Sequence, residues 1–274
     1  MGLSSNILWH QTDEKGFYEI LTTKKLRYSY SLERIILDTK SKFKLKSFAF
    51  PMISTSDYPL SEIGNNKWAY GDYCIGFDLN WGEKIGFSPV CYCSYGSHIL
   101  QQANGLLNMA IKNNSQDLIV WAMYMFSQMK FVEAPLKTKQ KMFENYRFYD
   151  EREWRVVPNL TENNKAQVTP YLTEDGYNDY KEKNGGKSLL EIGEEFQYGD
   201  IRYIIVKTKE DINKTKEIVG NEIHIFTKEE IIEDVVGVDH HEEILPSQLQ
   251  LDIEASLRHL GRVFNSLRER KRND

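Results

Sequence analysis

Two glutamates, Glu151 and Glu153, stand two residues apart at the start of a run of aromatic and branched residues, Trp154 to Val157. Such a run is typical of a β-strand, and in an extended chain residues i and i+2 point to the same face. We therefore expect the two carboxylates side by side at the mouth of a cleft, where they suit acid–base catalysis or the stabilisation of a cationic transition state. The alternative is a solvated strand entry in which Arg152 and Arg155 are their ion-pair partners.

Three further groups of polar residues come earlier in the chain. The first ends a short predicted strand at 6–11, the second follows a predicted helix, and the third ends a predicted strand at 49–56. An imidazole, a guanidinium and a run of hydroxyls are hydrogen-bonding groups, and each group alone is a weak signal of function. The three groups are His10, Gln11 and Thr12; Arg27 and Tyr28; and Ser54 and Thr55 with Ser56. For Tyr28 and Arg27, a half-buried aromatic and a surface cation remain the alternatives.

Predicted strands and helices are interspersed along residues 1–235 and must position these groups. This pattern predicts one α+β domain. Asp13 is a plausible N-cap for a helix carrying Phe17, and 3.6-residue periodicity predicts helices at 101–114 and 115–131. A β-α-β-α pattern follows from 202 to 234. The polar stretch 161–187 is expected to be a long, partly mobile insertion.

The last forty residues differ in character from the domain. Residues 236–246 read as a linker, in which the adjacent His240 and His241 lack the spacing of a metal site. Residues 247–274 predict a helix with an apolar seam on a charged background. That helix either docks back on the domain or binds a partner.

Composition limits the class of protein. The chain has 274 residues, 41% hydrophobic content and a formal net charge of −5, so any nucleic-acid contact must come from a local patch. Lysines that could line such a patch, or form only a solvated face, are Lys40, Lys42, Lys44, Lys46, Lys137, Lys139 and Lys141. Three cysteines form no paired framework, and no secretory signal or membrane span is recognisable, which predicts a cytoplasmic protein.

The order of the motifs resembles that of the ADP-ribosyltransferase superfamily: a first-strand His, an STS-like strand and a late Glu-x-Glu strand. The resemblance covers roughly residues 8–157. It implies a split mixed or antiparallel β-sheet with flanking helices and, here, a C-terminal helical arm. It also implies NAD as substrate, no metal, and Glu153 or Glu151 as the catalytic acid with Tyr28 beside it. His10, Gln11, Thr12 and Arg27 would then hold the dinucleotide, with Ser54 and Thr55 bracing the site.

A resemblance to the AbiGi abortive-infection family covers more of the chain. It rests on LWHQTD, RYS, PLSEI, the stretch from Tyr70 to Tyr92, EREWRVVP and RYIIVK. That family is linked to phage defence and is often labelled an antitoxin. The RYS segment, which is expected to be a turn, and the Glu-x-Glu are also similar to the toxin of CmdTAC-type toxin–antitoxin–chaperone systems, an ADP-ribosyltransferase that modifies messenger RNA.

Three functions follow from these resemblances. The first is an NAD-dependent ADP-ribosyltransferase toxin that acts on RNA and is controlled by an antitoxin and a SecB-like chaperone. The second is a non-catalytic antitoxin or interaction protein of the same defence system. The third is a transferase whose acceptor is a protein.

Overall fold

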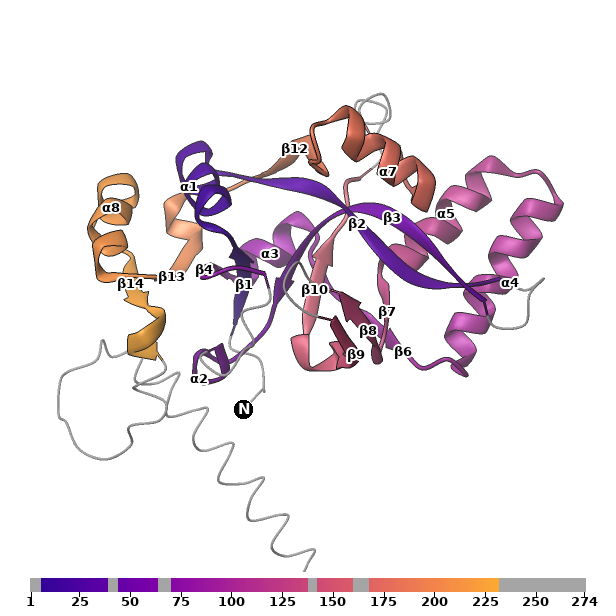
Figure 1. Cartoon of the computed structure of the whole chain (residues 1–274), viewed down its shortest axis with the longest axis horizontal. Helices are drawn as coiled ribbons and strands as arrows, with labels where there is room; N and C mark the ends of the chain where they lie inside the picture. Colours follow the sequence, from indigo (N-terminus) through magenta and orange to yellow (C-terminus); the bar gives the residue numbers. More distant parts are fainter. Residues whose placement is uncertain (1–5, 39–43, 64–69, 138–141, 160–167, 232–274) are drawn as a thin grey trace, which may run out of the picture. The chain divides into compact units, whose positions relative to one another are not determined.

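The computed structural model describes residues 6–38, 44–63, 70–137, 142–159 and 168–231. These residues form a mixture of helices and strands, which confirms the α+β class (Figure 1). They divide into two compact units. The first unit is drawn from Met1–Thr23, Asp57–Trp81 and Gln197–Asp274, and the second from Lys24–Ser56 and Gly82–Phe196. The chain passes from the first unit to the second after Thr23 and again after Trp81, within helix α3 (Leu79–Ile85).

The first unit is built on four neighbouring strands in the order β1-β4-β13-β14. Strand β1 pairs antiparallel with β4, from Ile7 opposite Asp78 to Thr12 opposite Tyr73, and β4 pairs antiparallel with β13. Strands β13 and β14 are parallel and joined through a helix, as the predicted β-α-β pattern requires. The strands are β1 (Ile7–Thr12), β4 (Tyr73–Asp78), β13 (Ile201–Val206) and β14 (His224–Thr227), with the 3-10 turn η2 (Tyr198–Asp200) before β13.

Helices α1 (Glu14–Thr23) and α8 (Lys209–Val219) pack against these strands and against each other. The carboxylate of Asp13 accepts a hydrogen bond from the backbone N–H of Gly16 at 2.8 Å, so the predicted N-cap is present. An apolar cluster in this unit joins alternate strand residues to the short helix α2 (Leu60–Ile63). It contains Ile7, Trp9, Leu60, Ile63, Cys74, Tyr203, Ile205 and Ile231.

A close approach within this unit explains one strand glycine. A Cβ on Gly76 would lie 2.6 Å from the ring of Trp9, the residue opposite it in β1. The glycine thus lets a large indole lie flat across the neighbouring strand. The indole N–H in turn donates to the carbonyl of Tyr58 at 3.0 Å, which ties the loop before α2 to the sheet.

The second unit is organised around a long antiparallel hairpin of β2 and β3, paired from Ser29 opposite Met52 to Asp38 opposite Lys44. Strand β12 pairs with β2, while β10 and β11 pair with different parts of β3, and β5 pairs with β10. The strands are β2 (Lys25–Asp38), β3 (Lys44–Ser56), β5 (Ser88–Pro89), β10 (Glu153–Val156), β11 (Leu172–Thr173) and β12 (Leu189–Glu195).

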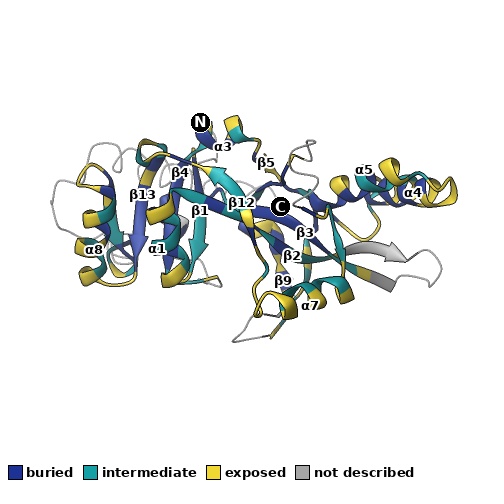
Figure 2. Cartoon of the chain, turned by 90° about the horizontal axis from the view of Figure 1, so that it is seen from above, coloured by how far each residue is buried: buried dark blue, intermediate teal, exposed yellow. Residues whose placement is uncertain are grey.

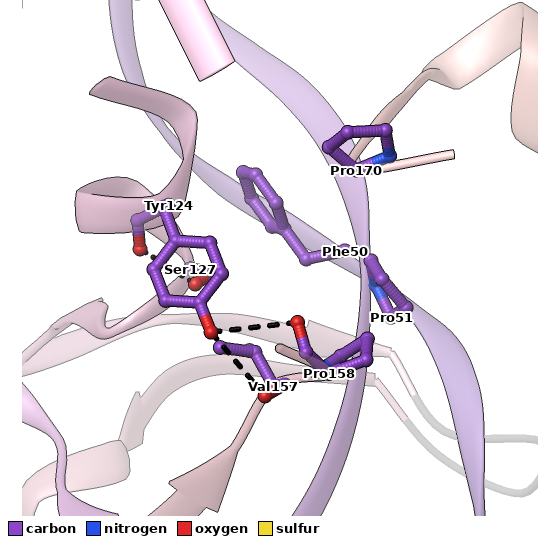
Figure 3. A pocket seen from close by; sticks show the side chains of 7 residues that line it. All are labelled: Phe50, Pro51, Tyr124, Ser127, Val157, Pro158 and Pro170. Atoms are coloured by element: carbon purple, nitrogen blue, oxygen red, sulfur yellow. Dashed lines mark hydrogen bonds between the residues drawn. The ribbon is translucent and has the colours of Figure 1, made fainter. Parts of the chain in front are cut away.

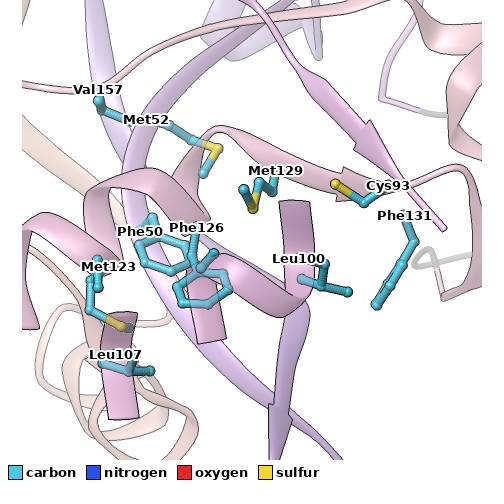
Figure 4. Packing of buried hydrophobic residues seen from close by; sticks show 12 residues of the cluster. Phe50, Met52, Cys93, Leu100, Leu107, Met123, Phe126, Met129, Phe131 and Val157 are labelled. Carbon is cyan, nitrogen blue, oxygen red and sulfur yellow. The ribbon is translucent and has the colours of Figure 1, made fainter. Parts of the chain in front are cut away.

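Two helices, α4 (His98–Lys112) and α5 (Gln116–Ser127), supply half of the residues in the second unit's apolar cluster. Their apolar faces meet Phe50 and Met52 of β3, and the close-up in Figure 4 shows these side chains pointing into one cluster. The cluster contains Phe50, Met52, Cys93, Leu100, Ala103, Leu107, Ala122, Met123, Phe126, Met129, Phe131 and Val157. The two helices connect the parallel strands β6 (Cys91–Cys93) and β7 (Met129–Phe131). Strands β8 (Glu133–Lys137) and β9 (Met142–Arg147) form a separate hairpin.

Two sequence predictions need correction. The helix predicted for 115–131 ends at Ser127, because its last residues form β7 and pair with β6. The RYS segment, expected to be a turn, lies inside β2. The described part of the stretch 161–187 contains β11 and a helix, α7 (Glu174–Lys183), and no residue of that helix is buried (Figure 2). That this stretch is a partly mobile insertion stays a prediction.

Other predictions concern residues outside the described ranges or are not tested. The linker at 236–246 and the helix at 247–274 lie outside the described residues. The single domain over 1–235 and the ADP-ribosyltransferase-like fold stay predictions. Within the described part of the chain, no helix has both the length and the apolar character needed to cross a membrane.

Candidate functional site

The two glutamates of the Glu-x-Glu motif come together through a turn and not through an extended strand. Glu151 is the last residue of the 3-10 helix η1 (Phe148–Glu151), and Arg152 adopts a left-handed conformation with φ of 45°. Glu153 then begins β10. The expectation that the pair shares one strand face is therefore wrong, and a tight turn brings the two carboxylates to the same place.

Both carboxylates are buried around one lysine. Glu151 and Glu153 are each 5% exposed, so the expected position at an open cleft mouth is wrong as well. The ammonium group of Lys130, also buried, lies 2.7 Å from Oε2 of Glu153 and 3.2 Å from Oε2 of Glu151. Lys130 sits in the middle of β7, which places its charge inside the unit.

Arg155 completes the pairing of Glu153. Its side chain is 0% exposed, and its Nε and Nη2 atoms donate to the two oxygens of Glu153 at 2.6 and 3.0 Å. Nη2 also donates to Oε1 of Glu33 at 2.6 Å, and Nη1 donates to the carbonyl of Ser127 at 2.8 Å. The alternative drawn from sequence is thus right that Arg155 pairs with the acidic motif and wrong that the pair is solvated.

We call Glu33, Lys130, Glu151, Glu153 and Arg155 the ionic cluster. Three carboxylates and two cations give it a formal charge of −1. Burial by itself would raise the pKa of Glu153, but the adjacent Arg155 and Lys130 outweigh burial and hold this pKa below its ordinary value. Burial likewise opposes the charged form of Lys130, yet Glu153, Glu33 and Glu151 raise its pKa. Both pKa shifts favour the charged forms of Glu153 and Lys130.

Aromatic side chains surround the cluster. The hydroxyl of Tyr92 accepts a hydrogen bond from the backbone N–H of Glu153 at 2.7 Å, and the Tyr149 ring packs edge-on against Tyr92. The Lys130 ammonium lies 4.4 Å from the centre of the Phe148 ring. Burial, and then the neighbouring Glu151, raise the pKa of Tyr146. These rings keep water from the charges and strengthen their interaction.

The hydroxyl-rich strand end lies directly beside the glutamate strand. In the β3–β10 pairing, Ser56 is opposite Glu153, Thr55 is opposite Trp154 and Ser54 is opposite Arg155. The buried Thr55 hydroxyl donates to the carbonyl of Trp154 at 3.4 Å. The structure therefore brings two of the predicted groups, Ser54–Thr55 and Glu153, into neighbouring strands of one unit.

Tyr28 and Arg27 lie on β2 of the same unit. Tyr28 is buried and its hydroxyl donates to a carboxylate oxygen of Glu194 on β12. Burial, followed by the contact with Glu194, raises the pKa of Tyr28. Arg27 is half-buried and lies opposite Gly193. Successive residues of a strand point to opposite faces, so Arg27 and Tyr28 are directed to different sides of β2.

His10, Gln11 and Thr12 belong to β1 of the first unit, where all three are half-buried. The Gln11 amide donates to the carbonyl of Gly71 at 2.9 Å. His10 lies opposite Ile75 and shares a strand face with Thr12, whereas Gln11 points to the other face. Their convergence with Glu153 stays a prediction.

Of the predicted nucleic-acid lysines, Lys46 is exposed on β3, and Lys44 and Lys137 are strand residues. Lys40, Lys42, Lys139 and Lys141 lie outside the described residues. Sequence reasoning missed Glu33 and Lys130 as partners of the glutamates. Lys130 carried a usable signal, because a lysine within an apolar run must find an acid when the run is buried.

A shallow hollow lies elsewhere in the second unit (Figure 3). It is lined by Phe50, Pro51, Tyr124, Ser127, Val157, Pro158 and Pro170, and by none of the predicted site residues. The Tyr124 hydroxyl donates to the carbonyls of Val157 and Pro158 at 3.3 and 3.4 Å. Among the described residues, no group of three or more His, Cys, Asp or Glu side chains could hold a metal ion.

Comparison with known proteins bears on the second unit above all. Residues 24–207 match the family model described as "Putative abortive phage resistance protein AbiGi, antitoxin". The chain belongs to the AbiGi family. The matched range contains all five residues of the ionic cluster together with β2, β3, α4 and α5. No curated protein and no solved structure matches the chain.

Proposed function

We propose that this AbiGi protein is the antitoxin of an abortive phage resistance system and acts by binding a partner protein. The observation that carries the proposal is the family match, which covers residues 24–207 and whose description names an antitoxin. The geometry of the ionic cluster supports the same function.

A catalytic carboxylate needs an oxygen that can reach the substrate or its proton. In the ionic cluster, Oε1 of Glu153 accepts from Arg155 at 2.6 Å, and Oε2 accepts from Lys130 at 2.7 Å and Arg155 at 3.0 Å. Freeing either oxygen would break a charge-assisted hydrogen bond from a buried cation, which would be left with its weaker set of acidic partners, Glu151 for Lys130 and Glu33 for Arg155. The cluster is thus suited to joining β2, β7 and β10 into a rigid body that presents a binding surface.

Growth assays test the antitoxin function. The chain would be induced in bacteria alone and together with the product of each gene that neighbours its own. The proposal expects no growth arrest from the chain alone, arrest from one neighbour alone, and relief of that arrest when both are present and co-purify. Arrest caused by the chain alone would overturn the proposal and identify the chain as the toxin.

A second candidate, an NAD-dependent ADP-ribosyltransferase acting on RNA bases, is favoured by the β3–β10 pairing. The resemblance noted in the sequence joins an STS strand to a Glu-x-Glu strand, and Ser54 to Ser56 lie opposite Glu153 to Arg155. In this reaction the bond between nicotinamide and the ribose carbon breaks, a bond from that carbon to a nucleophilic nitrogen of the base forms, and the base loses a proton.

The residues of this chain would share the work of that reaction. Glu153, or Glu151, would stabilise the positive charge that develops on the ribose and accept the proton. His10, Gln11, Thr12 and Arg27 would hold the dinucleotide, Tyr28 would pack on nicotinamide, and Ser54 and Thr55 would brace the acid. Lysines such as the exposed Lys46 would contact RNA phosphates. A transferase whose acceptor is a protein would not require these lysines.

Mass spectrometry of RNA incubated with the purified chain and NAD tests this second candidate. A gain of one ADP-ribose unit that depends on the chain would support it, and release of nicotinamide would have to match. Glu151→Gln and Glu153→Gln would identify the acid, with Glu195→Gln as a control at an exposed position of β12. If RNA, DNA and protein all stay unmodified, the transferase candidate is rejected and the antitoxin function is the one that stands.

A further inference from the structure

The outer face of helix α5 carries large apolar side chains that no part of the described chain covers. Trp121 is 71% exposed, and Leu118 and Met125 are 40% and 41% exposed. These three residues, the α5 stripe, are spaced i, i+3 and i+7 and therefore lie on one side of the helix. A different side of α5, which carries Met123 and Phe126, is packed in the core.

The two helices around this stripe are nearly free of charge. The 15 residues of α4 and the 12 residues of α5 include only Lys112 and Asp117 as charged side chains. Solvated helix faces are normally rich in Lys and Glu, whereas protein interfaces are depleted in charge and enriched in Trp, Tyr and Met. A lipid surface is a poor fit, since an interfacial helix carries a basic polar face and α5 has none.

We propose that the α5 stripe is a dimer interface in which α5 packs antiparallel against α5 of a second copy of this chain. The midpoint of Leu118 and Met125 falls between Trp121 and Ala122. A twofold axis through that point sets Leu118 of each copy opposite Met125 of the other, with the two indoles stacked at the centre. A twofold interface must be complementary to itself in this way.

Electrostatics selects the antiparallel over the parallel arrangement. Asp117 would lie about 14 Å along the helix from its counterpart at 1.5 Å per residue, beyond a screening length of about 8 Å. A parallel pair would bring the two Asp117 carboxylates together. The antiparallel pair also sets the positive end of each helix dipole beside the negative end of the other.

The area available fits a dimer of modest affinity. The exposed parts of the stripe and of the neighbouring Tyr124 offer apolar surface on the order of 400 Å². Asp117 in the first turn of α5 and Gln128, directly after its last residue, flank the stripe and supply a polar rim. Core and rim together approach the roughly 800 Å² that each partner of a specific complex buries, so we expect association at micromolar concentration.

Sedimentation of the full chain against concentration tests the interface. We expect a mass of twice 32.1 kDa at about 100 µM chain, and a dissociation constant weakened at least about 30-fold by Trp121→Glu. Met142→Glu is the matched control, because Met142 is 57% exposed on β9, away from α5, and its variant should remain a dimer. A monomeric wild-type chain, or a Trp121→Glu variant that still dimerises, would overturn the proposal.

Cysteine cross-linking tests the orientation. With a mild oxidant, the double variant Leu118→Cys, Met125→Cys should form a covalent dimer. Each single variant should form no more covalent dimer than the wild-type chain, whose native Cys91 sets the background. A covalent dimer from Leu118→Cys alone would indicate a parallel pair and overturn the proposed geometry. Because neither test measures toxin neutralisation or NAD chemistry, their outcome is separate from that of the proposed function.

Discussion

Each unit of this protein holds several elements together through one carboxylate, and the two carboxylates are satisfied in opposite ways. In the second unit, Glu153 is buried and faces two cations, Lys130 and Arg155. In the first unit, Asp211 is half-buried and faces neutral hydroxyls: Tyr18 and Tyr73 donate to its two oxygens at 3.1 and 3.0 Å.

The contrast shows how burial decides the choice of partner. Asp211 also accepts from the backbone N–H and the hydroxyl of Thr208 at 3.1 and 2.9 Å, as part of the capping box that begins α8. Water and these neutral donors suffice near the surface. A carboxylate as deep as Glu153 needs full opposite charges, and its partners are then just as dependent on it. We therefore expect damage to the ionic cluster to cost far more than damage around Asp211.

The largest effect is expected from Arg155→Met. It leaves Glu153 and Glu33 without their buried guanidinium, and we expect the free energy of unfolding to fall by roughly 3–5 kcal/mol. Urea denaturation followed by circular dichroism measures the change. Arg202→Met is the matched control, because Arg202 pairs with Asp78 at the surface. A loss below 1 kcal/mol for Arg155→Met would contradict the assigned role of the cluster.

The second largest effect is expected in the pH dependence of stability, which should distinguish Glu153 from Asp211. Because the folded-state pKa of Glu153 is lowered, its stabilisation is present above its unfolded pKa of about 4.3 and is lost as pH falls below that value. Each unit of lowering corresponds to about 1.4 kcal/mol. We expect Glu153→Gln to flatten the loss of stability between neutral and acidic pH, measured by urea denaturation at each pH. Glu195→Gln should keep the wild-type slope.

A smaller effect is expected from Asp211→Asn. The amide keeps the shape of the side chain and one acceptor oxygen, so we expect a loss of about 1–2 kcal/mol from the weakened tyrosine and Thr208 hydrogen bonds. Burial, with Asp211 as a lesser cause, raises the pKa of Tyr18 to about 12. Spectrophotometric titration of the tyrosines in Asp211→Asn should therefore show a small downward shift in the pKa of Tyr18. An Asp211→Asn loss equal to that of Arg155→Met would erase the distinction between the two centres.

The smallest effect is expected from Arg202→Met itself. The Arg202 side chain is largely exposed and its Nε donates to Asp78 at 2.6 Å. When the contact is broken, water solvates the guanidinium and Asp78 keeps its hydrogen bonds from Asn80, so the loss should stay below about 1 kcal/mol and shrink further in salt. Thermal unfolding in low and high salt measures it. A salt-independent loss of several kcal/mol would show that charge at the surface matters as much as charge in the core.

Much of the local structure was predictable because it depends on neighbours in sequence. The Asp13 cap, the strand beginning at Ile7, the two core helices and the β13-α8-β14 unit follow from capping residues and periodicity. The strand β7 was missed because Met129–Phe131 continues the apolar character of α5, and only its pairing with Cys91–Cys93 makes it a strand.

The site was predictable in composition and not in geometry. The sequence by itself determined that a Glu-x-Glu pair, a hydroxyl-rich strand end and several polar strand residues exist, and it determined the resemblance to the AbiGi family. Tertiary structure decided that Glu151 and Glu153 are buried, that a left-handed Arg152 turns one toward the other, and that Lys130 and Glu33 join them. The reason is physical: burial and ion pairing depend on residues far apart in the chain, 20 to 120 positions here, whose approach no local pattern records.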